Sequence, residues 1–524
     1  MTTPLRVLFV TSELNPLAKV GGLGDVAGAL PRALRELGVD VRVALPKYEV
    51  IDIAKYPAKL VVKQIPLSRC GITENIAVWK TVTPQNLGHG GWQRESGHTE
   101  RSREALAEHG ARCDRVPGLR TRERNIEVPV YLIDNPDYIG SGGIYFEKTA
   151  FVGSFKEIER FLFFSLATLE CFAALDWWPD IIHCQDWHTG MIPTLLAEKA
   201  KRDERYRSIK TLYTVHNLAN QGRWNARDVT NFLCLDLPAR DDGDLNLMER
   251  GLRNATAINT VSKTYAKEIQ TPEFGEGLAR LLKSEGDHVY GIVNGVDQEF
   301  FNPETDDFIK QTYTQETVND AKSENKRDLQ RTLGLPESDA PLFGLVSRFT
   351  SQKGIELVAE ILPDLVRAGA QCVFLGVGEE HLEQKLTDAA KRHPQNIVTA
   401  LRFDAKLANQ IYAGADLFLM PSKFEPCGLG QMIAMRYGTI PIVRKTGGLV
   451  DTVTPYAGGK TDDQGWGFAF QEFSTEALKA AALEALEVYQ DKPTWQHLIQ
   501  NAMAYDSSWI HAAKEYVALY HKIV

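Results

Sequence analysis

The sequence lacks several features that would assign a protein class at once. Its seven cysteines are widely spaced and odd in number, and no two of them form a C-x-x-C pair. Neither a disulfide framework nor a zinc site is therefore indicated, and a reducing, cytoplasmic location is expected. The apolar stretch before Thr11 is too short for a signal peptide, and no window reaches the roughly 18 apolar residues of a membrane span.

The chain also lacks the excess of positive charge that is typical of nucleic-acid-binding proteins. Its 524 residues carry a formal net charge of −9. This balance argues against nucleic acid or an anionic membrane as the main partner, although it leaves room for a locally basic cleft. Since 524 residues are too many for one hydrophobic core, we expect two domains, or three, and a small or neutral partner.

Short β-branched runs alternate with helical patterns along most of the chain, which is typical of parallel sheets with crossover helices. The first series of predicted strands comprises residues 7–10, 39–45, 128–133, 181–184, 211–215, 257–261 and 291–293. After a charged stretch the pattern restarts, with predicted strands at 342–346, 372–375, 397–401, 417–420 and 440–443. This repetition predicts two doubly wound α/β units in tandem. Their ligands are expected beyond the carboxyl ends of the strands, in a cleft between the units.

The segment 84–125 interrupts this alternation. It contains eight arginines and no lysine, with scarcely any aliphatic periodicity, between two good strand patterns. We interpret it as an exposed insertion. Its arginines are interleaved with acidic residues that reduce the local field, so a solvated loop is favoured over a contact surface for an anionic partner.

A glycine-rich loop, residues 19–26 (KVGGLGDV), joins the first predicted strand to a helix. Its glycines let backbone N–H groups approach a ligand, the positive end of the helix lies at the same point, and Lys19 adds a full charge. This combination suits phosphate or sugar oxygens. Strand–glycine–helix turns are also common as plain packing solutions, so both interpretations stay open here.

The second half carries further signals at the predicted carboxyl ends of strands. Residues 347–354 (SRFTSQKG) place Arg348 and Lys353 before a helix, where two cations suit a diphosphate. Two more turns, 424–430 (FEPCGLG) and 445–449 (KTGGL), follow later strands. We therefore expect these three turns to meet at one edge of the second sheet.

Together and in this order, these motifs resemble those of bacterial glycogen synthases and plant starch synthases, which are retaining glycosyltransferases of the GT-B type. Residues 183–188 (HCQDWH), 214–218 (TVHNL) and 294–297 (NGVD) add to the resemblance, which covers the chain essentially end to end apart from 84–125. It implies transfer of glucose from a nucleotide sugar, usually ADP-glucose in bacteria, to the nonreducing 4-OH of glycogen or another α-1,4-glucan. Neither a metal nor a cofactor is expected.

The resemblance also implies the architecture. Two doubly wound Rossmann-like domains would face each other across a deep cleft. The first, at 1–293, would bind the acceptor, and the second, at 294–499, the nucleotide sugar. A final helix at 500–524 would return to the first domain. The sequence leaves the oligomeric state open.

Roles for individual residues follow from the resemblance. Lys19, Arg348 and Lys353 would hold the diphosphate, and such cations stabilise the negative charge that grows on a departing diphosphate. Glu425 would contact glucose hydroxyls and His188 the sugar; together with the three cations they form the expected catalytic set. The nucleotide-sugar site would be completed by Gly21, Gly22, Asn217, Phe403, Cys427, Gly428, Leu429, Thr446 and Gly447. Phe403 would stack on the base.

Retention of configuration could arise from double displacement, which needs a carboxylate nucleophile, or from front-face internal return. Because the family pattern offers no unambiguous nucleophile, we favour front-face return, in which the leaving phosphate helps to deprotonate the acceptor. One departure concerns the acceptor. Relatives often carry Asp-Asn where this chain has Lys156-Glu157, so that role is not transferred, and Glu157 and Glu159 remain alternatives.

Several competing interpretations remain at this stage. His183, Asp186 and His188 imitate a metal site, but packing and sugar-proximal roles are favoured. The sequence Asp242-Gly243-Asp244 spells a metal-binding D-x-D, for which we favour a turn. Rival functions are a phosphorylase, a transferase with UDP-glucose or a different acceptor, and a non-catalytic glucan-binding protein.

Overall fold

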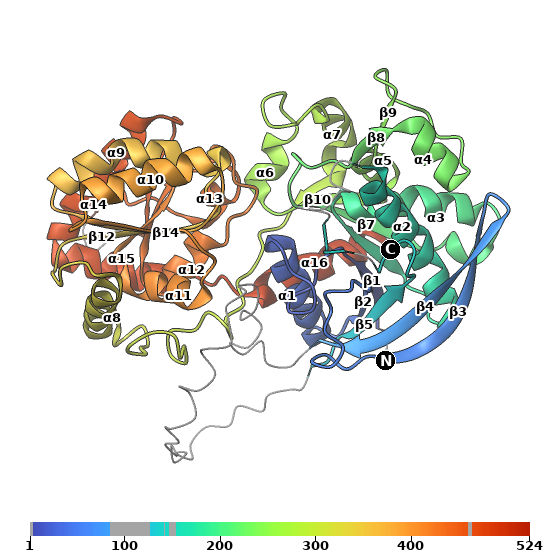
Figure 1. Cartoon of the computed structure of the whole chain (residues 1–524), viewed down its shortest axis with the longest axis horizontal. Coiled ribbons are helices and arrows are strands. Elements are labelled where there is room, and N and C mark those ends of the chain that lie inside the picture. Colours follow the sequence, from blue (N-terminus) through green and yellow to red (C-terminus); the bar gives the residue numbers. More distant parts are fainter. Residues whose placement is uncertain (1–3, 84–125, 141, 146–153, 460–463) are drawn as a thin grey trace, which may run out of the picture.

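The computed structural model describes residues 4–83, 126–140, 142–145, 154–459 and 464–524. The insertion predicted at 84–125 lies outside this range. The described residues form two α/β domains, each built around a largely parallel sheet (Figure 1). The two tandem units predicted from the sequence alternation are confirmed. No described helix is both long enough and apolar enough to span a bilayer.

Over the described residues, the N-terminal sheet has nine strands in the order β11-β10-β7-β6-β1-β2-β5-β4-β3. Their bounds are β1 (Arg6–Val10), β2 (Asp40–Pro46), β3 (Lys59–Arg69), β4 (Ile72–Val82), β5 (Pro129–Asp134), β6 (Ile181–Gln185), β7 (Lys210–Val215), β10 (Ala257–Thr260) and β11 (Val289–Gly291). Neighbouring strands are parallel except that β4 runs antiparallel to both β3 and β5. A separate hairpin pairs β8 (Arg223–Asn225) with β9 (Asp244–Asn246).

Helices cover both faces of this sheet. They are α1 (Gly22–Glu36), α2 (Phe155–Ala174), α3 (Ile192–Ala200), α4 (Ala226–Leu233), α5 (Leu247–Asn254), α6 (Lys263–Glu268) and α7 (Ala279–Glu285). α2 is apolar around most of its circumference, and it is accordingly buried in the core with α3, α4 and α5. α1 buries only one stripe and packs in a second core on the opposite face of the sheet.

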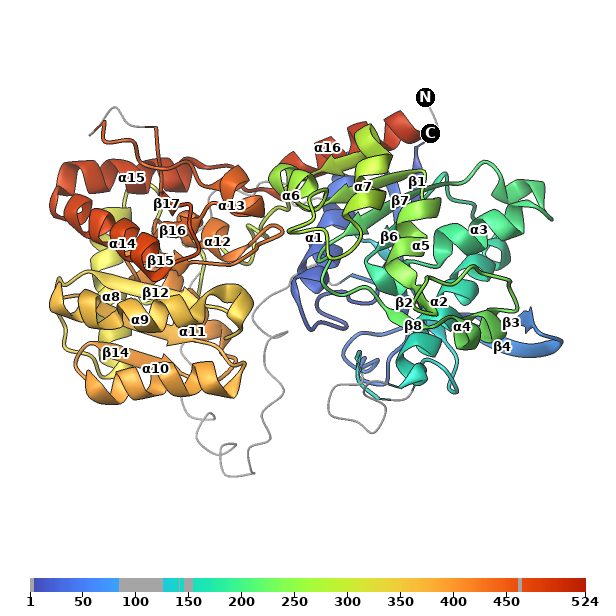
Figure 2. The same ribbon diagram turned by 90° about the horizontal axis from the view of Figure 1, so that it is seen from above.

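The second sheet, within the described part of the chain, has six parallel strands in the order β14-β13-β12-β15-β16-β17. Their bounds are β12 (Leu342–Val346), β13 (Gln371–Leu375), β14 (Ile397–Ala400), β15 (Leu417–Met420), β16 (Ile440–Arg444) and β17 (Phe468–Phe470). The helices around it are α8 (Val318–Leu333), α9 (Ile355–Arg367), α10 (Glu380–Arg392), α11 (Ala405–Gly414), α12 (Gly430–Arg436), α13 (Gly447–Thr452), α14 (Thr475–Gln490) and α15 (Lys492–Ala504). Figure 2 shows the two domains side by side.

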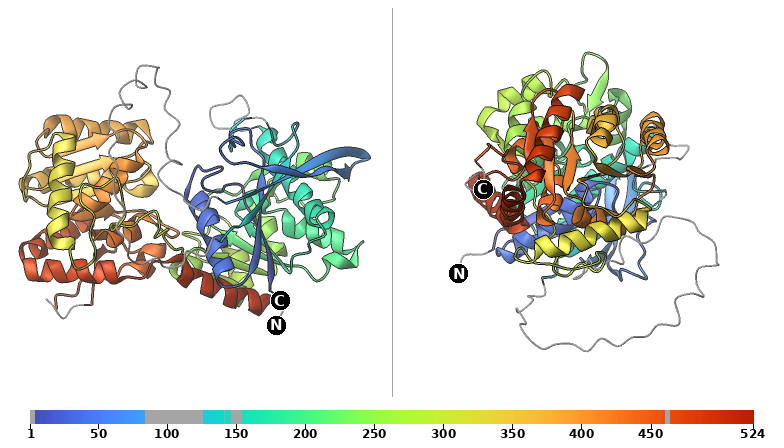
Figure 3. Two further views of the ribbon diagram at one scale, coloured as in Figure 1. Left: turned by 90° about the horizontal axis from the view of Figure 1, so that it is seen from below. Right: turned by 90° about the vertical axis from the view of Figure 1, so that its left-hand side faces the viewer.

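The last helix, α16 (Trp509–Ile523), leaves the C-terminal domain and packs beside α1 on the N-terminal sheet (Figure 3). The final helix was expected from residue 500, but residues up to Ala504 belong to α15, and α16 begins at Trp509. Buried hydrogen bonds tie α16 to the strands. The Asn259 amide donates to the Tyr516 hydroxyl at 3.0 Å, and Tyr520 Oη lies 2.8 Å from His183 Nδ1.

The proton positions in this network follow from its geometry. Thr214 donates its hydroxyl proton to Asn259 Oδ1 at 2.5 Å, so its oxygen accepts from His183 Nε2 at 2.6 Å. His183 Nδ1 is then the acceptor for the Tyr520 hydroxyl. Burial lowers the pKa of His183 well below its usual value, in keeping with a neutral ring.

One expectation about the cysteines is wrong. Cys70, in the turn between β3 and β4, and Cys234, at the end of α4, form a disulfide with their Cα atoms 5.7 Å apart. The 164 residues between them hide this proximity in the sequence. The other described cysteines, Cys171, Cys184, Cys372 and Cys427, are buried and free.

Replacing Tyr520 with Phe tests how the C-terminal helix is fastened. The substitution leaves His183 Nδ1 buried without its donor, so the free energy of unfolding should fall by about 1–3 kcal/mol in denaturant titrations. Tyr56→Phe, in a residue that packs against the same core, is the control and should change it little. Equal effects of the two substitutions would contradict the assigned network.

Candidate active site

The glycines of the loop after β1 divide into two groups. A Cβ atom on Gly24 would lie 2.9 Å from Lys19 Cγ, and one on Gly28 would lie 2.9 Å from a backbone oxygen. A Cβ atom on Gly22 would meet nothing within 4 Å, and one on Gly21 would meet only Glu13 Oε1, at 3.8 Å. Packing therefore explains Gly24 and Gly28, whereas Gly21 and Gly22 border open space at the start of α1. The packing interpretation thus holds for Gly24, and ligand binding at Gly21 and Gly22 stays a prediction.

Glu13 is a component of this loop that the sequence analysis missed. Its buried Oε2 accepts the N–H groups of Val20 and Gly21, both at 2.8 Å. The Gly21 N–H, one of the glycine donors expected to approach a ligand, is thus used within the protein. The N–H groups of Gly22 and Leu23 open helix α1, where no intrahelical acceptor exists for them. The available signal was a carboxylate just beyond the carboxyl end of β1.

The Lys19 side chain lies against the first turn of α1. Its Nζ lies 2.5 Å from Asp25 Oδ1, and its side chain is 18% exposed. Burial raises the pKa of Asp25, and the lysine opposes that shift. The cation is therefore held at the loop by a neighbour on α1.

His188 lies in a short 3-10 turn, Trp187–Thr189, that follows β6. It is 6% exposed, and its Nδ1 is buried without a hydrogen-bond partner among the described residues. Burial lowers the pKa of His188 to about 3, so the imidazole is neutral. The ring packs against Trp187, with centroids 4.0 Å apart, and against Phe161 at 4.6 Å. A rigid neutral imidazole with an unused nitrogen is suited to a sugar hydroxyl.

The two residue groups that resemble metal sites in the sequence are bonded to other protein groups. Asp186 accepts the N–H groups of His216, at 2.8 Å, and Asn217, while His183 belongs to the network with α16. Burial raises the pKa of Asp186 to about 7. In the D-x-D sequence, both aspartates lie near Arg223, at 2.5 and 3.4 Å, in a turn whose central glycine has φ +82°. These observations favour packing and turn roles.

In the C-terminal domain, the structure brings Lys353 and Glu425 together. Lys353 Nζ lies 2.5 Å from Glu425 Oε2, which also accepts the Ser422 hydroxyl at 2.9 Å. Glu425 is buried, and Lys353 immediately precedes α9. Arg348, in the turn after β12, is exposed and has no ion-pair partner within the described ranges. Both cations therefore follow β12 at the carboxyl edge of the sheet, and Lys353 contacts the buried carboxylate.

Glycines allow the loops at this edge to stack on one another. A Cβ atom on Gly354 would lie 2.3 Å from the Pro421 carbonyl oxygen. On Gly447 and Gly448 it would lie 1.9 Å and 2.2 Å from the carbonyl oxygens of Glu425 and Cys427. The Gly448 N–H also donates to the Glu425 carbonyl at 3.0 Å. The three predicted turns therefore meet, and their backbones fix the position of Glu425.

Two residues expected at the nucleotide sugar, Thr446 and Gly447, also contact the other domain. Thr446 Oγ1 and the Gly447 N–H donate to the Glu268 carboxylate of α6 at 3.2 and 3.0 Å. In return, the Thr264 N–H and hydroxyl donate to Asp451 of α13 at 2.8 and 2.6 Å. Each short helix supplies a carboxylate to the start of the other. This reciprocal capping joins the two domains.

The remaining predicted positions lie near these loops or at their own turns. Cys427 is buried, which raises its pKa to about 12, so it remains a thiol. Gly428 and Leu429 precede α12 directly. Asn217 Oδ1 accepts the Ala219 N–H at 3.1 Å, and Phe403, 70% exposed, lies between β14 and α11.

Asn294 belongs to the NGVD motif, and the sequence alone assigned its side chain no role. It is buried, and its Oδ1 has no hydrogen-bond partner among the described residues. Its backbone bonds to the Cys427 thiol, which places it next to the Glu425 loop. Near the expected acceptor position, Lys156 is 54% exposed and pairs with Glu159 at 2.6 Å.

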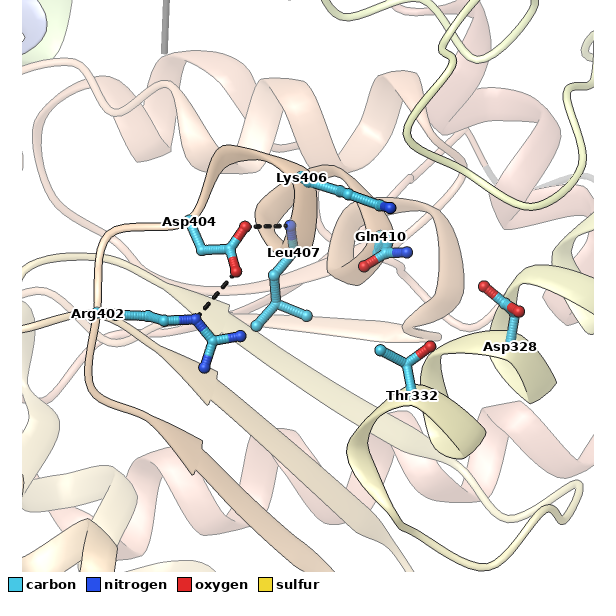
Figure 4. A pocket seen from close by; sticks show the side chains of 7 residues that line it. All are labelled: Asp328, Thr332, Arg402, Asp404, Lys406, Leu407 and Gln410. Atoms are coloured by element: carbon cyan, nitrogen blue, oxygen red, sulfur yellow. Dashed lines mark hydrogen bonds and ion pairs between the residues drawn. The ribbon is translucent and has the colours of Figure 1, made fainter. Parts of the chain in front are cut away.

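A cavity of about 320 Å³ lies elsewhere, between α8 and α11 (Figure 4). The Arg402 and Asp404 side chains on its wall bond to each other at 3.0 Å, and Asp404 also caps α11 through the Leu407 N–H. No residue predicted for the site lines it. Phe403 lies between Arg402 and Asp404 in the sequence but is not among the lining residues.

Comparisons with known proteins cover both domains. Residues 6–284 match the family model for the starch synthase catalytic domain, and residues 326–504 match that for glycosyl transferases group 1. The chain is 40% identical to the glycogen synthase of Desulforudis audaxviator, over 99% of this chain and 96% of that protein. It is likewise 40% identical to the glycogen synthase of Bacillus cereus, over 99% of this chain and 100% of that one.

Solved structures agree with these sequence matches. The catalytic domain of starch synthase IV from Arabidopsis thaliana, bound to ADP and acarbose, superimposes with a TM-score of 0.83 at 30% identity, covering 99% of both chains. Sucrose-phosphate synthase from Thermosynechococcus elongatus, at 15% identity and a TM-score of 0.53, shares the fold. The fold is thus GT-B, and the chain belongs to the glycogen and starch synthase family.

Proposed function

We propose that this hexosyltransferase transfers glucose from ADP-glucose to the nonreducing end of an α-1,4-glucan, with retention of configuration. The observation that carries the proposal is the Lys353–Glu425 pair at the carboxyl edge of the second sheet. Family membership supports it, as does a relative whose structure contains ADP and acarbose. The same relative supports the binding of a nucleotide and a glucan.

In this proposal, residues of the C-terminal domain bind different parts of ADP-glucose. Lys353 and Arg348 bind the diphosphate, whose negative charge grows as the bond to glucose breaks. Glu425 accepts hydrogen bonds from glucose hydroxyls. In the absence of donor, Lys353 and Glu425 neutralise each other, and ADP-glucose would separate them so that each finds its own ligand group.

The N-terminal residues approach the donor from the other side. Lys19 adds a cation near the open space at Gly21 and Gly22. We assign the neutral His188 to the sugar. Domain closure about the α6–α13 contact would bring both sets to one substrate and expel water that hydrolyses the donor.

Retention proceeds by front-face return in this account. Glu425 is fixed by Lys353 and Ser422 as a hydroxyl-binding group, and we assign no carboxylate nucleophile. The leaving phosphate takes the proton of the acceptor hydroxyl as the new glycosidic bond forms on the same face. A covalent glucosyl adduct on a carboxylate, detected by mass spectrometry, would contradict this mechanism.

The lysine assignment is tested by measuring glucose incorporation into glycogen from ADP-glucose and from UDP-glucose. Lys353→Ala should lower turnover on the order of 10²–10³-fold, because a preorganised cation is removed from the leaving group. Lys479→Ala, which breaks the ion pair with Asp364 instead, should leave it unchanged. Transfer from neither donor by the folded protein would favour a glucan-binding role.

The two groups of loop glycines give a second test. Gly22→Ala should leave the melting temperature unchanged or slightly higher but raise KM for ADP-glucose, because its Cβ enters open space at the ligand. Gly24→Ala should instead lower the melting temperature, because its Cβ meets Lys19. If Gly22→Ala leaves KM at the wild-type value, the loop does not approach the donor.

A further inference from the structure

The Glu13 carboxylate connects two parts of the N-terminal site. Oε2 accepts the N–H groups of Val20 and Gly21 at 2.8 Å each, and Oε1 accepts the Tyr145 hydroxyl at 2.7 Å. With three donors on its two oxygens, the carboxylate has limited freedom to rotate. Hydrogen bonds to a charged acceptor are roughly twice as strong as neutral ones, so the arrangement is rigid.

Tyr145 carries the connection to His188. Its ring stacks on the imidazole with centroids 5.2 Å apart and planes 29° from parallel. Its oxygen also lies 3.3 Å from Ser12 Oγ, so both ends of the side chain are held. Burial and the nearby Glu13 charge raise the pKa of Tyr145 well above its usual value, so the hydroxyl keeps its proton and remains a donor.

Burying the Glu13 carboxylate costs free energy that a compensating role should explain. Desolvating a charge costs far more than an apolar contact, and a loop that merely joined β1 to α1 would be held by packing alone. Glu13 is only 4% exposed, yet it holds the part of the loop whose glycines border open space. It thereby selects which donors face outward, because Val20 and Gly21 are used internally while Gly22 and Leu23 remain at the helix start.

We propose that Glu13 and Tyr145 are positioning residues that set the Lys19 loop and the His188 ring in one mutual geometry. This inference rests on the proposed function, in which the loop meets the diphosphate and His188 meets the sugar. Neither Glu13 nor Tyr145 needs to touch the substrate. A change at Glu13 is transmitted to His188 through the tyrosine, without direct contact between the two.

Tyr145→Phe is the mild test, since it keeps the stacked ring and removes only the hydroxyl. We expect kcat with ADP-glucose and glycogen to fall about ten- to hundredfold. Tyr138→Phe is a matched control, because the Tyr138 hydroxyl also donates to a carboxylate, Glu74, at 2.7 Å, and its ring also stacks, on Phe163. It should cost similar stability but leave kcat unchanged. Equal kcat values for both variants would reduce Tyr145 to a structural role and overturn the proposal.

A second readout does not depend on activity. In protein labelled with 15N-histidine, the His188 imidazole signals, assigned with His188→Gln, should shift in Glu13→Gln and stay in place in Tyr138→Phe. Unshifted His188 signals in Glu13→Gln would overturn the proposal even if the enzyme were active. If the signals shift but the wild-type protein transfers no glucose, the coupling holds and the proposed function fails.

The double variant Glu13→Gln/Tyr145→Phe completes the test. Since the Tyr145 hydroxyl acts through its hydrogen bond to Glu13, the combined loss in kcat should equal that of the more damaging single variant. Multiplied losses would mean that the two residues act independently, which contradicts the proposed connection.

Discussion

The close approach of backbones at the carboxyl edge of the second sheet is the constraint on which the active site depends. Gly354, Gly447 and Gly448 leave no room for a side chain, because carbonyl oxygens of the neighbouring loop occupy the space. That stacking holds Glu425 beside Lys353 before any ligand binds. A buried ion pair contributes little to stability by itself, so its value here is positional. The pair holds the Lys353 cation for the diphosphate and the Glu425 carboxylate for the glucose hydroxyls of one ADP-glucose molecule.

In the N-terminal domain, a buried carboxylate rather than close backbone packing holds the loop at the site in place. Glu13 fixes the loop that carries Lys19 and, through Tyr145, reaches His188. The domains are joined where α6 and α13 cap one another and where α16 returns to the first sheet. The α6–α13 contact adjoins the Glu425 loop, because Gly447 packs against the Glu425 carbonyl, so the junction of the domains borders the donor-facing set.

Much of the fold could be predicted because its signals are local. β-branched runs and turn glycines marked most strands and the three C-terminal turns. β3 escaped prediction because its pattern is weak, with only Ile65 and Leu67 buried. The role of Glu13 and the Cys70–Cys234 disulfide depend on partners 132 and 164 residues away, which no local pattern records. The contact of Thr446 and Gly447 with Glu268 across the domain junction was likewise hidden, because it joins residues 178 and 179 positions apart, and their place at the donor stays a prediction.

The central claim, that Lys353 serves the diphosphate and Glu425 the sugar, is tested most directly by calorimetric titration of ADP into Glu425→Gln, with turnover measured in parallel. The variant removes the charge that holds Lys353 in the unliganded protein. The account predicts that ADP binds at least as tightly as to the wild type while turnover falls on the order of 10²-fold or more. A parallel loss of ADP affinity and turnover would contradict it.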